Sequence, residues 1–273
     1  MNKFKSIAIG VLVTIVLATT TAIAEDNFYA GINVFSRDYK EDLILPHKST
    51  EHGQLYGLIV GYKSIDFDEM FWEVEGNYAF GNTKYAGSLQ NLVTGAWGGF
   101  HKDKTKNEIF NLEGKLGYTF DIADSMLTPY VGVGYHSWLR DLSKNGLGFK
   151  EKYTWPYLSA GVNFSTGDWF DDWEIGVGVK AMAMTRGKMK LDNLSTRLKL
   201  GNKVNFEVEL PITYRTDDGV FGVEAIKIVP YFQKFSIGKS NTLTVDVAGG
   251  GRASFYKPAS KTKVVGVKLV VEF

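Results

Sequence analysis

The chain has 273 residues, of which 44% are apolar and 22% charged, with a formal net charge of +1 and no cysteine. The apolar content excludes a disordered tail, and the lack of cysteine excludes disulfides and hence a small cross-linked secreted scaffold. The near-neutral total excludes little by itself, because the charges are unevenly distributed along the chain.

The N-terminus has the three-part pattern of a secretory signal peptide. Two lysines in MNKFK precede the apolar run SIAIGVLVTIVLA, and Ala22-Ile23-Ala24 is a small-residue cleavage pattern. A run of 13 residues is shorter than the roughly 20 that a membrane-spanning helix needs. We therefore expect residues 1–24 to be removed and residues 25–273 to form one mature domain.

The rest of the chain alternates between apolar and polar residues in short segments, which is typical of transmembrane β-barrel strands. In MFWEVEGNYAF, for example, Trp72, Val74 and Tyr78 share one face, and Glu73 and Glu75 share the other. The pattern predicts strands at 27–37, 53–62, 70–80, 109–120, 127–136, 154–164, 173–184, 204–215, 220–235 and 264–273.

These segments predict an all-β fold, a membrane-spanning antiparallel up-and-down β-barrel of about ten strands, since bacterial single-chain barrels have an even count. Eight and twelve strands remain alternatives. The ninth segment fits least well, because Glu224 and Lys227 share a face only if the register slips. We expect a β-bulge around Ala225 and Ile226 there.

The connections alternate in length and in charge. The short ones, at 63–69, 121–126, 165–172 and 216–219, together hold ten acidic residues and one lysine, whereas the five long ones hold 21 basic and ten acidic residues. Short periplasmic turns and long extracellular loops are the rule for such barrels. The sequence therefore predicts an acidic periplasmic end and a basic extracellular end.

Aromatic residues on the apolar faces cluster near the strand ends, whereas a soluble β-sandwich core would scatter them. Those near the short connections are Phe28, Tyr62, Trp72, Tyr118, Phe120, Phe164, Trp173, Tyr214 and Phe273, and those near the long ones are Tyr56, Phe80, Phe110, Tyr135 and Phe232. Two interfacial girdles of this kind indicate that the apolar face meets lipid. Closure into a barrel follows, because hydrocarbon cannot satisfy an open sheet edge.

LTPYVGVGYH at 127–136, the Ala-Ile-Ala cleavage site and the terminal Phe273 together resemble the small outer-membrane β-barrel superfamily of Gram-negative bacteria, the OmpA-like and opacity-type proteins. The resemblance covers the whole mature chain as a pattern. It implies an outer-membrane location and makes Phe273 the signal that the barrel assembly machinery reads. The chain departs from the OmpA-like pattern in having no C-terminal peptidoglycan-binding domain, so a direct link to the cell wall is not implied.

Alternation directs a set of charged residues into the barrel lumen: Glu73, Glu75, Glu113, Lys115, Glu174, Lys180, Glu207, Glu209, Arg215 and Lys268. Eight strands leave an interior that side chains fill, whereas open aqueous channels need about sixteen strands. Two interpretations follow. The charges form a paired polar plug in a protein with a structural or surface-interaction role, or they line a narrow channel for small solutes.

A rim-located enzyme, either a protease or a lipid-modifying enzyme, is the third possibility. Of the histidines His47, His52, His101 and His136, only His136 lies on a strand with inward phase, and its neighbour Ser137 points the opposite way. The two are therefore not a ready base and nucleophile. The histidines also lack the close spacing of a metal site. We expect no catalytic residues, no metal and no cofactor.

The fourth long loop, TRGKMKLDNLSTRLKLGNK at 185–203, has six cations against Asp192 alone. Its Arg186, Lys188, Lys190 and Arg197 are candidates for binding the phosphate groups of lipopolysaccharide, the abundant phosphates at the outer rim. A solvated basic loop without a ligand is the alternative. We thus expect outer-membrane lipid and lipopolysaccharide as partners, and no nucleic acid in this compartment.

Overall fold

The computed structural model describes residues 28–43, 47–65, 68–90, 96–123, 125–143, 149–166, 172–192, 197–216, 222–247 and 251–273. The expected signal peptide lies outside these residues. Within the described part of the chain, no helix has the length and apolar character to cross a membrane.

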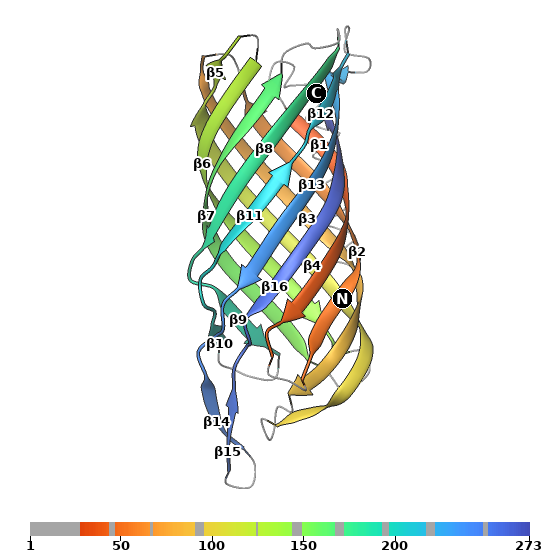
Figure 1. The fold of residues 1–273 in the computed structure, drawn as a ribbon, viewed down its shortest axis with the longest axis vertical. Coiled ribbons are helices and arrows are strands. Elements are labelled where there is room, and N and C mark those ends of the chain that lie inside the picture. Colours follow the sequence, from red (N-terminus) through yellow and green to blue (C-terminus); the bar gives the residue numbers. More distant parts are fainter. Residues whose placement is uncertain are drawn as a thin grey trace.

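Ten antiparallel wall strands close into a tall barrel (Figure 1). The wall strands in order are β1 (Phe28–Glu41), β2 (Ser49–Ser64), β3 (Met70–Gln90), β4 (Trp97–Tyr118), β6 (Ser125–Asp141), β7 (Lys150–Thr166), β8 (Trp173–Met184), β11 (Val204–Glu209) with β12 (Ile212–Arg215), β13 (Ala225–Ile237) and β16 (Ser260–Glu272). β16 pairs with β1 and closes the barrel. β11 and β12 form one wall strand that is interrupted at Pro211, because proline has no N–H to donate to the ladder.

The remaining strands are short. β5 (Phe120–Asp121) pairs with β6 at the end of the barrel that carries the short connections, which we call the turn end. At the opposite loop end, β9 (Lys188–Leu191) and β10 (Arg197–Lys199) form a hairpin on the edge of β7, and β14 (Leu243–Val247) and β15 (Gly251–Phe255) form a second hairpin that projects beyond the barrel (Figure 1).

The observed faces confirm the predicted alternation. On β16, Val265, Val267 and Leu269 are exposed on the outer surface, whereas Glu272 is buried and Lys268 forms an ion pair in the lumen. Aromatic ring pairs follow the outer surface at the turn end: Phe28 with Phe273, Tyr62 with Trp72, Tyr118 with Phe120 and Trp173 with Tyr214, at centroid distances of 6.1, 4.9, 4.9 and 5.1 Å. This is the girdle that the sequence indicates at this end.

Two expectations need correction. The bulge expected around Ala225 and Ile226 is wrong, because β13 begins at Ala225, leaves Glu224 outside the strand, and pairs with β16 without a register shift. The wall also extends farther than predicted at the loop end: β3 continues to Gln90 and β4 begins at Trp97. Much of the chain expected as extracellular loop is therefore strand. Its outward residues are polar, so the apolar alternation used to predict strands ends before the strands do.

Candidate functional site

Paired charges occupy the turn-end half of the lumen. The Nζ of Lys115 lies 2.9 Å from an oxygen of Glu73, and the Nζ of Lys180 lies 3.0 Å from Glu113 and 2.9 Å from Glu207. Glu73 and Lys115 lie opposite each other on the neighbouring strands β3 and β4, and Glu207 and Lys180 do so on β11 and β8. The contact of Lys180 with Glu113 of β4 joins strands that are not neighbours in the wall. Such pairs offset the desolvation cost of burying the charges.

The other predicted lumen charges also have partners. Lys268 pairs with Glu209 at 2.5 Å, and Arg215 pairs with Glu174 at 2.8 Å near the turn-end mouth, where half of the Arg215 side chain is exposed. Glu75 accepts a hydrogen bond of 3.1 Å from the hydroxyl of Tyr29. Each of the ten predicted charges thus has a partner within the polar filling of the lumen.

The sequence-based set left out further members of this filling. Tyr29 also donates to Glu73 at 2.5 Å, and Glu272 accepts contacts from Lys63 at 2.5 Å and from Lys227 at 2.9 Å. Their inward phase follows from the same alternation, so the signal was present. Lys63 was missed because it was assigned to a turn, whereas β2 continues through it to Ser64.

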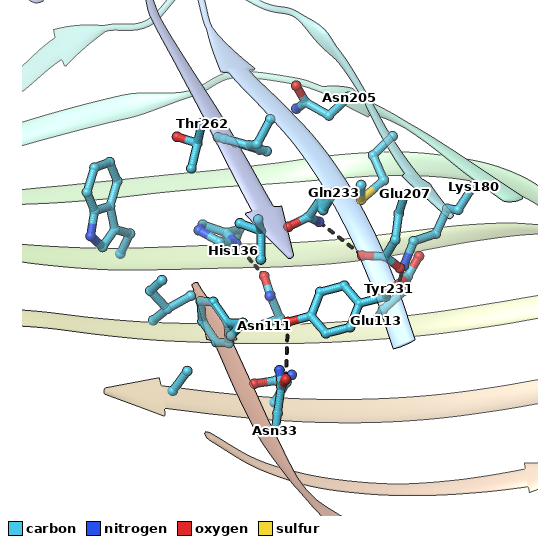
Figure 2. Close-up of a pocket in the computed structure, with 18 of the residues that line it drawn as sticks. Asn33, Asn111, Glu113, His136, Lys180, Asn205, Glu207, Tyr231, Gln233 and Thr262 are labelled. Atoms are coloured by element: carbon cyan, nitrogen blue, oxygen red, sulfur yellow. Dashed lines mark hydrogen bonds and ion pairs between the residues drawn. The ribbon is translucent and has the colours of Figure 1, made fainter. Parts of the chain in front are cut away.

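Amide side chains line a cavity of about 100 Å³ at mid-lumen (Figure 2). The hydroxyl of Tyr231 donates to Asn33 at 3.1 Å, and the amide of Gln233 donates to Glu207 at 3.1 Å. His136 forms a hydrogen bond with Asn111. Toward the turn end lies a second cavity of about 190 Å³, and Glu75, Lys180, Glu207 and Lys268 line both.

A layer of stacked rings forms part of the lining of the mid-lumen cavity. The ring of Trp155 on β7 stacks on His136 of β6 at 4.0 Å and on Phe235 of β13 at 4.9 Å. A second stack follows toward the loop end, in which Trp138 lies 4.6 Å from Tyr153 and 3.8 Å from the guanidinium of Arg37. Strong cation–π attraction is expected where such a contact is desolvated.

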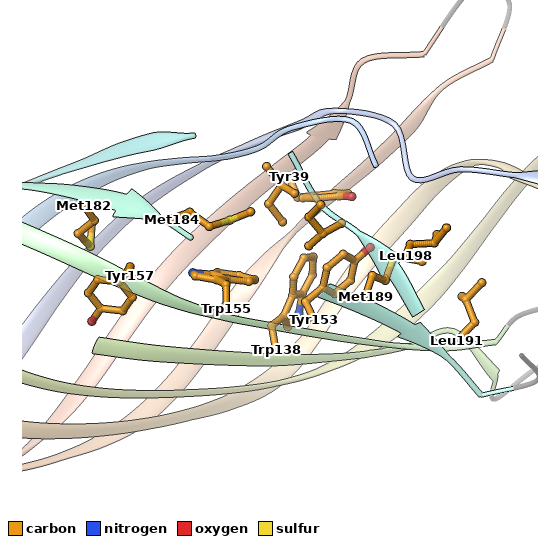
Figure 3. Close-up of a cluster of buried hydrophobic side chains, with 12 residues drawn as sticks. Tyr39, Trp138, Tyr153, Trp155, Tyr157, Met182, Met184, Met189, Leu191 and Leu198 are labelled. Atoms are coloured by element: carbon orange, nitrogen blue, oxygen red, sulfur yellow. The ribbon is translucent and has the colours of Figure 1, made fainter. Parts of the chain in front are cut away.

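Trp138, Tyr153 and Trp155 belong to the largest buried apolar cluster among the described residues, which we call the plug, and Phe235 packs against it (Figure 3). Its members are Tyr39, Trp138, Tyr153, Trp155, Tyr157, Met182, Met184, Met189, Leu191, Leu198, Leu200 and Ile237. Trp138 and Trp155 are each only 1% exposed, and Tyr153 is 0% exposed. These rings in the loop-end half of the lumen are therefore as fully buried as the side chains of a soluble core.

Arg140 organises a charged layer beside the plug. Its Nε lies 2.5 Å from Glu51, its Nη1 lies 2.7 Å from Glu151, and the same nitrogen lies 3.8 Å from Glu41. Burial alone would lower the pKa of Arg140, but the nearby carboxylates outweigh it and hold the pKa well above its usual value. The sequence reasoning missed this layer, because it placed Arg140 and Glu151 in a loop.

We expect the layer to weaken in acid. Burial favours protonated Glu41, but the attraction of Lys257, 3.1 Å away, and of Arg140 outweighs it and keeps the pKa of Glu41 below its usual range. This contribution is complete above the unfolded-state pKa of about 4.3 and is lost as pH falls through the folded pKa. Unfolding free energies at neutral pH and in acid should show a smaller acid loss in Glu41→Gln than in the wild type; equal losses would contradict the assignment.

The predicted phosphate-binding residues lie at the loop end. Lys188 and Lys190 are exposed on β9, and Arg197 is exposed on β10, opposite Lys190. Arg186 is exposed in the turn that leads into β9, with a positive φ of 47°. The structure thus brings three of the four cations together on one side of a hairpin and leaves Arg186 in the preceding turn.

The histidines are dispersed. His136 points into the lumen, as its phase predicts, and its ring is enclosed by the stack described above. His52 lies on the outer surface, 2.5 Å from Asp38, and both side chains are well exposed. Across the residues for which the structure gives positions, no group of three or more potential metal ligands occurs.

The closed wall, the apolar outer belt and the aromatic girdle together define an outer-membrane β-barrel protein. The chain belongs to the outer membrane protein β-barrel domain family, whose model matches residues 8–206. A comparison with curated proteins gives no match. The protein is located in the outer membrane, and the rule of short periplasmic turns orients its turn end toward the periplasm.

Several solved outer-membrane structures are similar to this chain. The outer membrane protease OmpT from Escherichia coli is 12% identical, with 93% of this chain and 100% of that chain covered and a TM-score of 0.54. The transport unit of the autotransporter AIDA-I from Escherichia coli is 9% identical over 93% and 92% of the two chains, with a TM-score of 0.45. OprG from Pseudomonas aeruginosa is 12% identical over 91% and 95%, with a TM-score of 0.36. The match to OmpT, at 12% identity, shows the fold alone.

Proposed function

We propose that this protein is a closed, non-catalytic outer-membrane barrel with a structural or surface-interaction role. The observation that carries the proposal is the plug. Rings from β6, β7 and β13 meet in the middle of the lumen. The Arg140 layer lies beside them and leaves a cavity of only about 50 Å³ against the buried side chains of β9 and β10. Solutes in the cavity of about 190 Å³ near the turn end would meet this packed layer before reaching the cell surface.

The surface role rests on the loop end of the wall. Strands such as β3 and β4 continue well past the outward Phe80 and Phe110, so the barrel presents a rigid sheet surface outside the membrane. Rigid elements position binding groups more reliably than free loops do. Outer-membrane lipid and lipopolysaccharide are the expected partners at this surface, and the barrel assembly machinery is the expected partner during biogenesis.

A narrow channel is the competing function, and a liposome-swelling assay separates it from a closed barrel. Proteoliposomes containing the protein should not swell in an isosmotic arabinose solution, while those containing a large open porin should swell quickly. Swelling that grows with the amount of the reconstituted protein would overturn the closed-barrel proposal.

The rim-enzyme alternative has weaker support. Its candidate base, His136, is enclosed by Trp155 and Phe235, so a substrate at the rim would have to displace the plug to reach it. The exposed pair of His52 and Asp38 lies on the outer wall of β1 and β2, and the similarity to a protease is one of fold. We propose that neither histidine serves catalysis.

Phe273 provides a test of the assembly signal. Its backbone N–H donates to Phe28 at 2.9 Å and its ring lies against that of Phe28, so it completes the seam between the last strand and the first. We expect Phe273→Ala to lower the amount of protein in isolated outer membranes severalfold, while Phe28→Ala, which removes the same ring contact, lowers it less. Equal effects would mean that the seam contact alone matters.

A further inference from the structure

The hairpin of β9 and β10 has two chemically opposite faces. Met189, Leu191 and Leu198 are buried in the plug, whereas the residues between them point away from the barrel. The outward residues are Lys188, Lys190, Arg197 and Lys199, and all four are exposed. The hairpin is therefore a lid on the plug, with a cationic outer surface.

The register gathers these cations with one from the wall. β9 pairs with β7 so that Lys190 lies opposite Lys152, and β10 pairs with β9 so that Arg197 lies opposite Lys190. Lys199 lies opposite Lys188 in the neighbouring row. Directly opposed residues on one face are about 4.5–5.5 Å apart at Cβ, and like charges in this position are destabilising.

No acidic group relieves this repulsion among the residues with described positions. Asp192, which follows β9, lies 4.0 Å from Lys150, and Asp141 of β6 lies opposite Lys150, which is not one of these cations. None of the five cations forms an ion pair with a carboxylate in this part of the structure, and residues 193–196 contain no acidic side chain. An anion from outside the protein would therefore relieve the repulsion and gain several charge-assisted contacts.

The position of this face along the barrel, relative to the membrane boundary, identifies the source of the anion. Outward-facing Tyr135, near the loop-end membrane boundary, lies opposite Pro156 of β7. Thr154, the next outward residue on β7, lies opposite Lys188, and a step of two residues along a strand is about 7 Å. Aromatic girdles lie at the headgroup level of the bilayer. The cations therefore begin where lipid phosphates lie.

We propose that the outward face of β7, β9 and β10 is a binding site for the phosphate groups of an anionic glycolipid in the outer leaflet, and that the bound lipid holds the β9–β10 lid on the plug. The residues that bind are Lys152, Lys188, Lys190, Arg197 and Lys199. Lipid binding and closure of the lumen are coupled, because the two faces of one hairpin serve them. The second part rests on the proposed closed barrel, and the first does not.

The test compares two triple variants of equal charge. K152S/K190S/R197S removes three cations of the proposed site. K40S/K84S/K104S removes three exposed cations from β1, β3 and β4, a part of the wall that also carries the acidic residues Asp38 and Glu108. The affinity of each variant for lipid A is measured in phosphatidylcholine vesicles that contain diphosphorylated lipid A, dephosphorylated lipid A or neither. Losing three charge-assisted contacts with the lipid phosphates should weaken binding on the order of 100-fold.

We expect the site variant to lose this affinity and the matched variant to keep it within about threefold. Equal losses in the two variants would mean that general electrostatic attraction explains the binding, and would overturn the proposed site. Unchanged binding by the site variant would overturn it as well. Amide hydrogen exchange of residues 188–191 provides the second readout: diphosphorylated lipid A should slow it in the wild type and not in the site variant. If lipid left the exchange unchanged, the proposed coupling between lipid binding and the lid would be overturned. If soluble pyrophosphate protected these residues equally, the proposal that the anion comes from the membrane would be overturned.

Failure of the closed-barrel proposal would be recognised separately. Solute passage through the wild-type barrel would refute closure and would leave the lipid-affinity comparison intact, since that comparison does not depend on conduction.

Discussion

Replacing Arg140 by methionine should lower the free energy of unfolding by about 3–5 kcal/mol, the usual cost of removing one partner from a buried ion pair. Arg140 is 3% exposed and contacts Glu51 and Glu151 at 2.5 and 2.7 Å. Its loss leaves these carboxylates buried without the cation that compensates them. Methionine retains much of the side-chain volume, so the change tests charge more than packing.

Guanidinium unfolding in lipid vesicles, followed by tryptophan fluorescence, measures this effect. Arg186→Met is the matched control, because Arg186 is an exposed arginine in a turn at the same end, and surface substitutions usually change stability by no more than about 0.5 kcal/mol. If both variants lost a similarly small amount, the Arg140 layer would not be a structural element of the lumen.

Trp155→Ala should cost a similar amount, about 3–5 kcal/mol, because a buried indole leaves a cavity that its neighbours cannot fill. The ring is 1% exposed and stacks on both His136 and Phe235, so its removal takes away two of the three ring contacts among these side chains. The cavity of about 100 Å³ next to it would enlarge toward the cell surface.

The same unfolding experiment tests this prediction, with Trp173→Ala as the control. Trp173 is 46% exposed on the outer surface, where lipid tails replace the lost contacts, so we expect less than half of the loss. A cost for Trp155→Ala no greater than that of the control would show that the plug is loosely packed.

The wall could be predicted from sequence because its signal is local. Alternation alone assigns Glu73 and Lys115 to the lumen and Val267 to the lipid face, and the structure pairs the first two at 2.9 Å. Strand ends were harder, because the outward residues beyond the membrane are polar and the apolar periodicity stops. Arg140 and Glu151 fell into a presumed loop for this reason, although β6 and β7 pair across them.

The plug could not be predicted because it depends on contacts across the barrel. Trp155 and Phe235 meet only because ten strands close with a particular stagger, and no local pattern encodes this. The β9–β10 lid is an intermediate case. KMKL and RLK do alternate, but segments of four and three residues are too short to separate from the surrounding loop.

Current recording in planar lipid bilayers tests the closed lumen most directly. The account predicts that the purified, folded wild-type protein inserts and gives no steady current steps under an applied voltage, because paired charges and stacked rings fill its interior. Reproducible openings of constant size, in preparations free of other porins, would contradict it.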